Sequence, residues 1–202
     1  YNLLHQILTL ITPFITTTYI ARVLGTNGVG IQSYTSSVVQ YFSILAALGT
    51  ASYGQREIAR HRDDRRERSR VFWEIELLCA GTTALCLVVW LGVIAFSKAY
   101  APYYAALTMT LAAVAFDISW MFGGMEQYRL IVIRNTAIKL AGIALMFLFV
   151  KDSGDLLLYI ALLAATGLLG NISMWGYLGR FVDPVDVRSL KIRRHLKEVI
   201  VY

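Results

Sequence analysis

The sequence predicts an all-α protein that crosses a membrane several times. Hydrophobic residues make up 57% of the 202 residues, charged residues only 16%, and the mean hydropathy is +0.57. Soluble domains are nearer to about 45–50% apolar and about 25% charged. Apolar runs of about 20 residues, the length that a helix needs to cross a bilayer, recur along the chain. We therefore expect a polytopic membrane protein in place of a soluble helical domain.

Six apolar segments account for most of the chain. They lie at 2–21, 30–53, 71–96, 103–122, 130–150 and 156–178. Short turns that contain glycine separate them, such as LGTNGVG after the first segment and KDSGD after the fifth. Another apolar run begins near 198–202. We therefore expect residues 1–202 to form one six-transmembrane-helix lobe, cut at both ends and followed by a seventh helix.

The positions of Lys and Arg predict the orientation of this lobe. Seven arginines lie between 56 and 70, and six Lys and Arg lie between 180 and 197. The loops on the other side carry only Arg22, Lys98 and Lys151. Short cytoplasmic loops are enriched in Lys and Arg, so we expect a cytoplasmic N-terminus. The basic residues of these loops account for the net charge of +6, so we expect no nucleic-acid partner.

Polar side chains follow one face of several apolar segments. The predicted stripes are His5, Thr9, Thr12 and Thr16 on the first segment and Ser33, Ser36, Ser37 and Gln40 on the second, with Asn135 on the fifth. Spacings of three and four residues place such side chains on one helix face. A water-filled cavity explains these stripes, and helix packing through small and hydroxyl side chains is the alternative.

Charged residues inside the fourth and fifth segments indicate the functional part of the chain. They are Asp117, Arg134 and Lys139. A charge at mid-bilayer costs about 2.5–3.5 kcal/mol on insertion scales, so it must be paired or must face water. Asp117 can form a structural ion pair with one of the two bases. In the alternative, at least one base stays free to bind an anionic substrate.

Motifs of catalysis are missing from the sequence. It contains no HExxH, CxxC, P-loop or nucleophile-elbow pattern, and its three histidines are far apart. Cys79 and Cys86 lie seven residues apart within one predicted helix, too far apart for a disulfide. We therefore expect neither an enzyme nor a site for a metal or cofactor.

Four stretches of the sequence resemble one transporter family. They are PFITTTYIARVLGTNGVGIQSY (13–34), LGTASYGQREIARHRDD (48–64), DISWMFGGMEQYRLIVIRNTAIKL (117–140) and RRHLKEVIVY (193–202). In this order they resemble the polysaccharide biosynthesis flippases, which move O-antigen and capsule repeat units. That family belongs to the multidrug/oligosaccharidyl-lipid/polysaccharide exporter superfamily. Thr18, where the family often has proline, and Gly124-Met125, where it often has Gln-Gly, depart from its pattern.

The resemblance implies the N-terminal half of a two-lobed exporter fold that works by alternating access. Its substrate would be an undecaprenyl-pyrophosphate-linked oligosaccharide, carried across the bacterial inner membrane. By the same resemblance, Arg22, Arg134 and Lys139 are substrate-binding cations. The implied partners are this lipid-linked oligosaccharide, the lipid bilayer, the missing C-terminal lobe and a glycan polymerase.

The alternatives are another transporter of the same superfamily and a membrane enzyme. A peptidoglycan-precursor flippase of the same superfamily shares the anionic substrate, whereas a multidrug antiporter for cations does not suit segments in which bases outnumber acids. A membrane enzyme acting on the same glycans would need large outer loops. The loops predicted on that side are short.

Overall fold

The computed structural model describes the backbone of residues 2–186 and 190–201 and most of their side chains from residue 16 onward. The side chains of His5, Thr9 and Thr12 lie outside the described residues. All regular structure in the described part is helical, as the sequence predicts.

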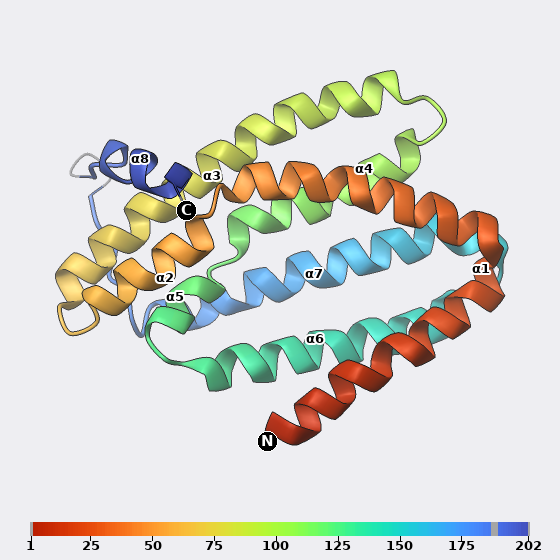
Figure 1. The fold of residues 1–202 in the computed structure, drawn as a ribbon, viewed down its shortest axis with the longest axis horizontal. Helices are drawn as coiled ribbons and strands as arrows, with labels where there is room; N and C mark the ends of the chain where they lie inside the picture. Colours follow the sequence, from red (N-terminus) through yellow and green to blue (C-terminus); the bar gives the residue numbers. More distant parts are fainter. Residues whose placement is uncertain (1, 187–189, 202) are drawn as a thin grey trace.

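The helices run side by side along the long axis of the molecule (Figure 1). In chain order they are α1 (Asn2–Ala47), α2 (Thr50–Arg60), α3 (Arg65–Phe96), α4 (Ala101–Ala112), the short 3-10 helix η1 (Ala113–Phe116), α5 (Ser119–Gly124), α6 (Tyr128–Phe149), the 3-10 helix η2 (Ser153–Asp155), α7 (Leu156–Leu178) and α8 (Arg193–Val201). α2, α5 and α8 lie at one end, which we call the charged end (Figure 1). The connections from α3 to α4 and from α6 to α7 lie at the opposite end (Figure 1).

Four helices in the described part are long and apolar enough to cross a membrane. They are Arg65–Phe96, Ala101–Gly124, Tyr128–Phe149 and Ser153–Leu178. The protein is therefore an all-helical, multi-pass membrane protein. These four correspond to the third to sixth predicted segments, and the last predicted segment coincides with α7 from 156 to 178.

The first two predicted segments form the two legs of α1. Its helical path bends at Gly25, whose φ of 68° and ψ of 176° lie in a region that only glycine adopts without strain. Figure 1 shows the two legs diverging from this bend at the end opposite α2. The turn predicted at LGTNGVG is thus a single sharp bend.

Two predicted segments are interrupted in the structure. The second was expected to run to 53, but Leu48 (φ 45°) and Gly49 (φ 79°) turn the chain between α1 and α2. The fourth was expected to be continuous from 103 to 122, but α4 changes to η1 after Ala112, η1 ends at Phe116, and α5 begins only at Ser119. Short polar side chains favour such breaks because they can bond the freed backbone groups. The Asp117 carboxylate does so by accepting from the Ser119 amide at 3.0 Å.

Helix α3 begins six residues before the predicted segment. Asp64 caps it, because its carboxylate accepts hydrogen bonds from the amides of Arg66 (3.0 Å) and Glu67 (3.1 Å). Helix α8 begins at Arg193, ahead of the predicted run at 198–202. These starts place charged residues within the helices instead of in loops.

Two clusters of buried apolar side chains hold the helices together. One lies at the charged end and includes Phe72, Trp120 and Met174. The other lies toward the opposite end and includes Trp90 and Tyr104, whose ring centroids are 5.1 Å apart. The residues of α3, α4 and α7 that separate these clusters line a cavity, described below.

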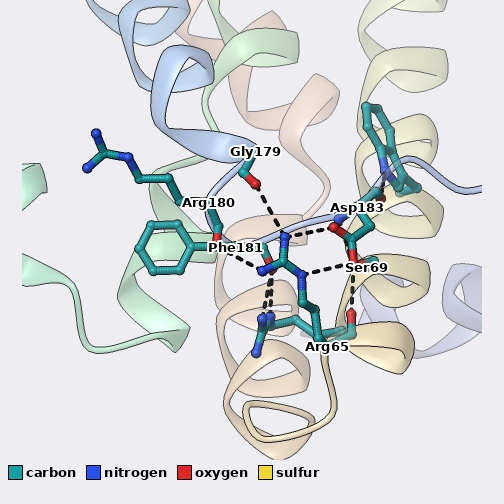
Figure 2. A network of polar contacts seen from close by, with 8 residues as sticks. Arg65, Ser69, Gly179, Arg180, Phe181 and Asp183 are labelled. Carbon is teal, nitrogen blue, oxygen red and sulfur yellow. Dashed lines mark hydrogen bonds and ion pairs between the residues drawn. The ribbon is translucent and has the colours of Figure 1, made fainter.

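The charged end is joined to the chain after α7 by a polar network (Figure 2). Arg65 donates two hydrogen bonds to the Asp183 carboxylate, at 2.9 and 2.7 Å. Arg68 donates to the Phe181 carbonyl at 2.8 Å, and the Ser69 hydroxyl accepts from the Asp183 amide at 2.9 Å. The start of α3 therefore fixes the path of residues 179–183.

Acid is expected to open this network. The Arg65 guanidinium lowers the pKa of Asp183 below its ordinary value of 3.8 by hydrogen bonding to the carboxylate. Because the folded pKa is the lower one, the contact contributes fully above pH 3.8 and is lost as the pH falls through the folded value. Trp73, whose Nε1 donates to the Asp183 carbonyl at 3.1 Å, should report this change by fluorescence. An unchanged acid transition in Asp183→Asn would contradict the assignment.

Candidate functional site

A cavity with polar side chains along part of its lining lies between the two apolar clusters, and we call it the polar cavity. It has a volume of about 350 Å³ and is bordered by the second leg of α1, α2, α3, α4 with η1, α5 and α7. Its polar lining consists of Gln40, Ser43, Thr50, Cys79, Thr110, Asp117 and Asn171. Volumes of about 300–1,000 Å³ are typical of small-molecule sites. Side chains from α1, α3, α4 and α7 thus meet at one cavity.

The break between η1 and α5 forms one wall of this cavity. Asp117 lies at the break and lines the cavity, as does Ala113 one turn earlier. The Ala113 carbonyl accepts a hydrogen bond from Asn171 Nδ2 at 2.8 Å. Irregular backbone at membrane depth persists only where protein groups or cavity water satisfy it. The break is therefore consistent with a hydrated cavity.

Arg134 reaches toward this cavity from α6. Its Nη1 donates to Asn171 Oδ1 at 2.8 Å, so Asn171 joins α6, α7 and η1. Arg134 Nε is buried and has no hydrogen-bond partner. Within the described residues no ion pair joins Arg134 to an acid, although Asp117 is near enough to interact with it electrostatically. The guanidinium is thus bound to a neutral amide in place of a carboxylate.

The other two predicted cations do not line the cavity. Lys139 lies further along α6, is half-buried, and has no partner among the described side chains. Arg22 is exposed and lies near the bend of α1, at the end of the molecule opposite the start of α6 (Figure 1). Asn135 is exposed on α6. The three cations therefore lie at different depths, and only Arg134 contacts a cavity residue.

The serine stripe of the second leg is mostly open to the surroundings. Ser33, Ser37 and Gln40 are exposed and Ser36 is half-buried. Ser37 donates to the Ser33 carbonyl at 2.8 Å, and Ser36 accepts from Gln32 at 3.2 Å. Of the four, Gln40 alone lines the cavity. Thr16 on the first leg is half-buried.

Sequence reasoning missed two buried acids in α3. Glu74 is 0% exposed and Glu76 is 4% exposed, although both would face the basic loop if the helix began at 71. Because α3 begins at Arg65, Glu76 lies eleven residues into the helix, about 17 Å from its start. The capping pattern Asp64-Arg65-Arg66-Glu67 was the signal that could have moved the helix start.

These features define a helical membrane protein with a polar cavity and, within a candidate span, an arginine that has no ion-pair partner among the described residues. Residues 1–201 match the family described as polysaccharide biosynthesis protein, and the chain belongs to that family. It is also 25% identical over 146 residues to a Shigella dysenteriae protein named "Putative O-antigen transporter". That match covers 71% of this chain and 37% of the relative, so the chain spans well under two thirds of the relative's length. No solved structure matches the chain.

Proposed function

We propose that this chain is the N-terminal lobe of a flippase for an undecaprenyl-pyrophosphate-linked oligosaccharide. The observation that carries the proposal is Arg134, a cation within a candidate span that contacts a neutral amide and leaves its buried Nε without a partner. Such a charge is costly at membrane depth unless an anion or water meets it. A pyrophosphate is a suitable anion, because its oxygens match the planar donors of a guanidinium.

The cavity suits the sugar part of such a substrate. Gln40, Ser43, Thr110 and Asn171 offer donors and acceptors of the kind that hydroxyl groups require. A volume of about 350 Å³ accommodates part of an oligosaccharide. The exposed serine stripe on the second leg of α1 would face the rest of it, across from the missing C-terminal lobe. Acidic sugars would meet Lys139 and Arg22 further along the path.

The chain would cross the membrane six times, because the two legs of α1 would cross it in addition to the four apolar helices. The charged end carries most Lys and Arg and would face the cytoplasm of the bacterial inner membrane. This orientation puts the N-terminus on the cytoplasmic side, and the N-terminal leg runs from there toward the bend at Gly25 (Figure 1). Rocking of the two lobes would expose the cavity to each side in turn. A glycan polymerase would use the product in the outer leaflet.

The test replaces Arg134 and Lys139 by alanine in the complete protein. We expect Arg134→Ala to lower surface glycan at least tenfold at unchanged protein level, because about 1.5–3 kcal/mol is typical of a hydrogen bond to a charged group. Lys139→Ala should have a smaller effect, and the double variant the largest. Exposed Lys98 at the opposite end provides the matched control, Lys98→Ala. Normal glycan in both single variants and the double variant would refute the proposal.

Transport of a cationic drug by the same protein would instead favour a multidrug antiporter. A peptidoglycan-precursor flippase would show a cell-wall defect with intact surface glycan. The glycan assay therefore separates the proposed substrate from both alternatives.

A further inference from the structure

A second hollow lies on the seam between α6 and α7, apart from the polar cavity. It has a volume of about 600 Å³, and its described lining is mostly apolar. Ile133, Ala137, Ala141 and Leu145 follow one another along α6 at intervals of four residues. Twelve residues of helix span about 18 Å, more than half of the roughly 30 Å hydrocarbon core. We call this hollow the seam groove.

Small side chains create the space in the seam groove. Ala137 and Ala141 on α6 are both exposed. Gly170 on α7 is instead filled by Ile138, since an added Cβ would lie 2.0 Å from Ile138 Cδ1, and it brings the two helices close together at the base of the groove. Larger apolar side chains form the rims, with Ile133 56% and Leu169 64% exposed. The groove is therefore open at the surface of the helix bundle along its length.

Arg134 lines the seam groove near its charged end. The same guanidinium donates to Asn171, which lines the polar cavity. One cation thus borders an apolar groove on one side and reaches a residue of a polar cavity on the other. Its Nε is buried without a hydrogen-bond partner, and Asn171 takes up only Nη1, so the guanidinium has donors beyond the one that is bound.

We infer that the seam groove holds the prenyl tail of the lipid-linked substrate while Arg134 contacts its phosphate; this rests on the proposed function. A ligand that fits must combine an extended apolar chain, an anion at one end and a polar group beyond the anion. A prenyl-pyrophosphate-linked sugar has these parts in this order. An ordinary phospholipid would fill the groove but would have no sugar to place in the cavity.

The groove would orient the substrate more than it would increase the affinity for it. Lipid tails are as apolar as the groove, so a prenyl chain gains little by leaving the bilayer for it. Most of the binding energy would come from the phosphate at Arg134, in surroundings of low dielectric. The groove aligns the chain so that the headgroup enters beside Asn171. If the groove is filled, the tail, which is joined to the phosphate, meets the added side chain and holds the headgroup away from Arg134. Filling the groove should therefore weaken binding of a tailed substrate without affecting a headgroup alone.

The experiment measures binding to the full-length protein in lipid nanodiscs. One probe is a polyprenyl-pyrophosphate-linked disaccharide, and the second is the same disaccharide pyrophosphate without the prenyl chain. We expect Ala141→Trp, which fills the groove, to weaken binding of the tailed probe at least tenfold and to leave the tail-less probe within twofold. Ala137→Phe is a second filling variant at another exposed groove position. Arg134→Gln should weaken binding of both probes.

Leu148→Trp is the matched control, because Leu148 is 65% exposed on the same helix and does not line the groove. Unchanged binding of the tailed probe in both filling variants would overturn this inference and leave the proposed function standing. Equal competition by phosphatidylglycerol would also overturn it, because the groove would then be a general lipid site. Failure of the unsubstituted protein to bind either probe would refute the proposed function itself.

Discussion

Glu74→Ala is expected to release the chain after α7 from the charged end and to lower the free energy of unfolding by about 3 kcal/mol. Removal of one partner from a buried ion pair typically costs about 3–5 kcal/mol. The lower value applies here because Arg194 keeps 41% of its side chain exposed. Glu74 itself is fully buried. Its loss would leave several donors without an acceptor.

The hydrogen-bond donors come from the chain near α8, and Arg70 of α3 adds an ion pair with Nε 3.6 Å from Glu74 Oε1. The Glu74 carboxylate accepts from the Lys191 amide at 2.7 Å, from Arg194 Nε at 2.6 Å and from His195 Nε2 at 2.7 Å. A carboxylate can only accept, so the His195 proton must lie on Nε2. The other ring nitrogen, Nδ1, is hydrogen-bonded to the Tyr53 hydroxyl at 2.7 Å. One carboxylate thereby connects α3 with α8 directly and with α2 through histidine.

The measurement combines thermal unfolding with limited proteolysis between α7 and α8. The control is Glu67→Ala, which removes a surface pair with Arg70 at 3.5 Å. Exposed pairs contribute about 0–1 kcal/mol, so this variant should remain close to the unsubstituted protein. Equal destabilisation by the two substitutions would show that the buried network has no special role. Faster cleavage in Glu74→Ala alone is the expected result.

The regular parts of the fold could be predicted from the sequence because hydrophobicity alone determines them. The segments at 130–150 and 156–178 match α6 and α7 within two residues at each end. The breaks at Leu48-Gly49 and at Asp117 could not be read in the same way. Each lies within an apolar run, and each depends on a local backbone turn or a capping hydrogen bond that hydropathy averages conceal.

The candidate site was only partly predictable, for a different physical reason. An arginine within an apolar segment is recognisable from the sequence alone, so Arg134 could be identified as a candidate before its surroundings were known. Its partner could not, because contact with Asn171 depends on how α6 and α7 are aligned across their seam. Asp117 was one of the two open possibilities for Arg134, and its carboxylate instead accepts from the Ser119 amide at the helix break. A local hydrogen bond to the Ser119 amide thus takes the place of an ion pair between Asp117 and Arg134.

Gly124→Ala is expected to destabilise the charged end by about 3 kcal/mol, the upper end of the range for overpacking. A Cβ at Gly124 would lie 2.6 Å from the Gln55 carbonyl oxygen and 2.8 Å from Ile58 Cβ. Neither atom is the end of a flexible side chain, so α2 and α5 would have to separate. A Cβ added at Gly54 would likewise lie 2.5 Å from Trp120 Cε3, so the two helices approach through glycine on both sides.

The same substitution should also disturb the cavity, because α5 connects the break at Asp117 to the start of α6. Gly176→Ala in α7 is the matched control, since an added Cβ there has no neighbour within 4 Å. Alanine is up to about 1 kcal/mol more favourable than glycine within a helix, so this control should be neutral or stabilising. The unfolding temperature and the amount of surface glycan should both fall in Gly124→Ala and should not fall in Gly176→Ala. If both variants retain stability and glycan, close contact of α2 and α5 is not required to position Arg134.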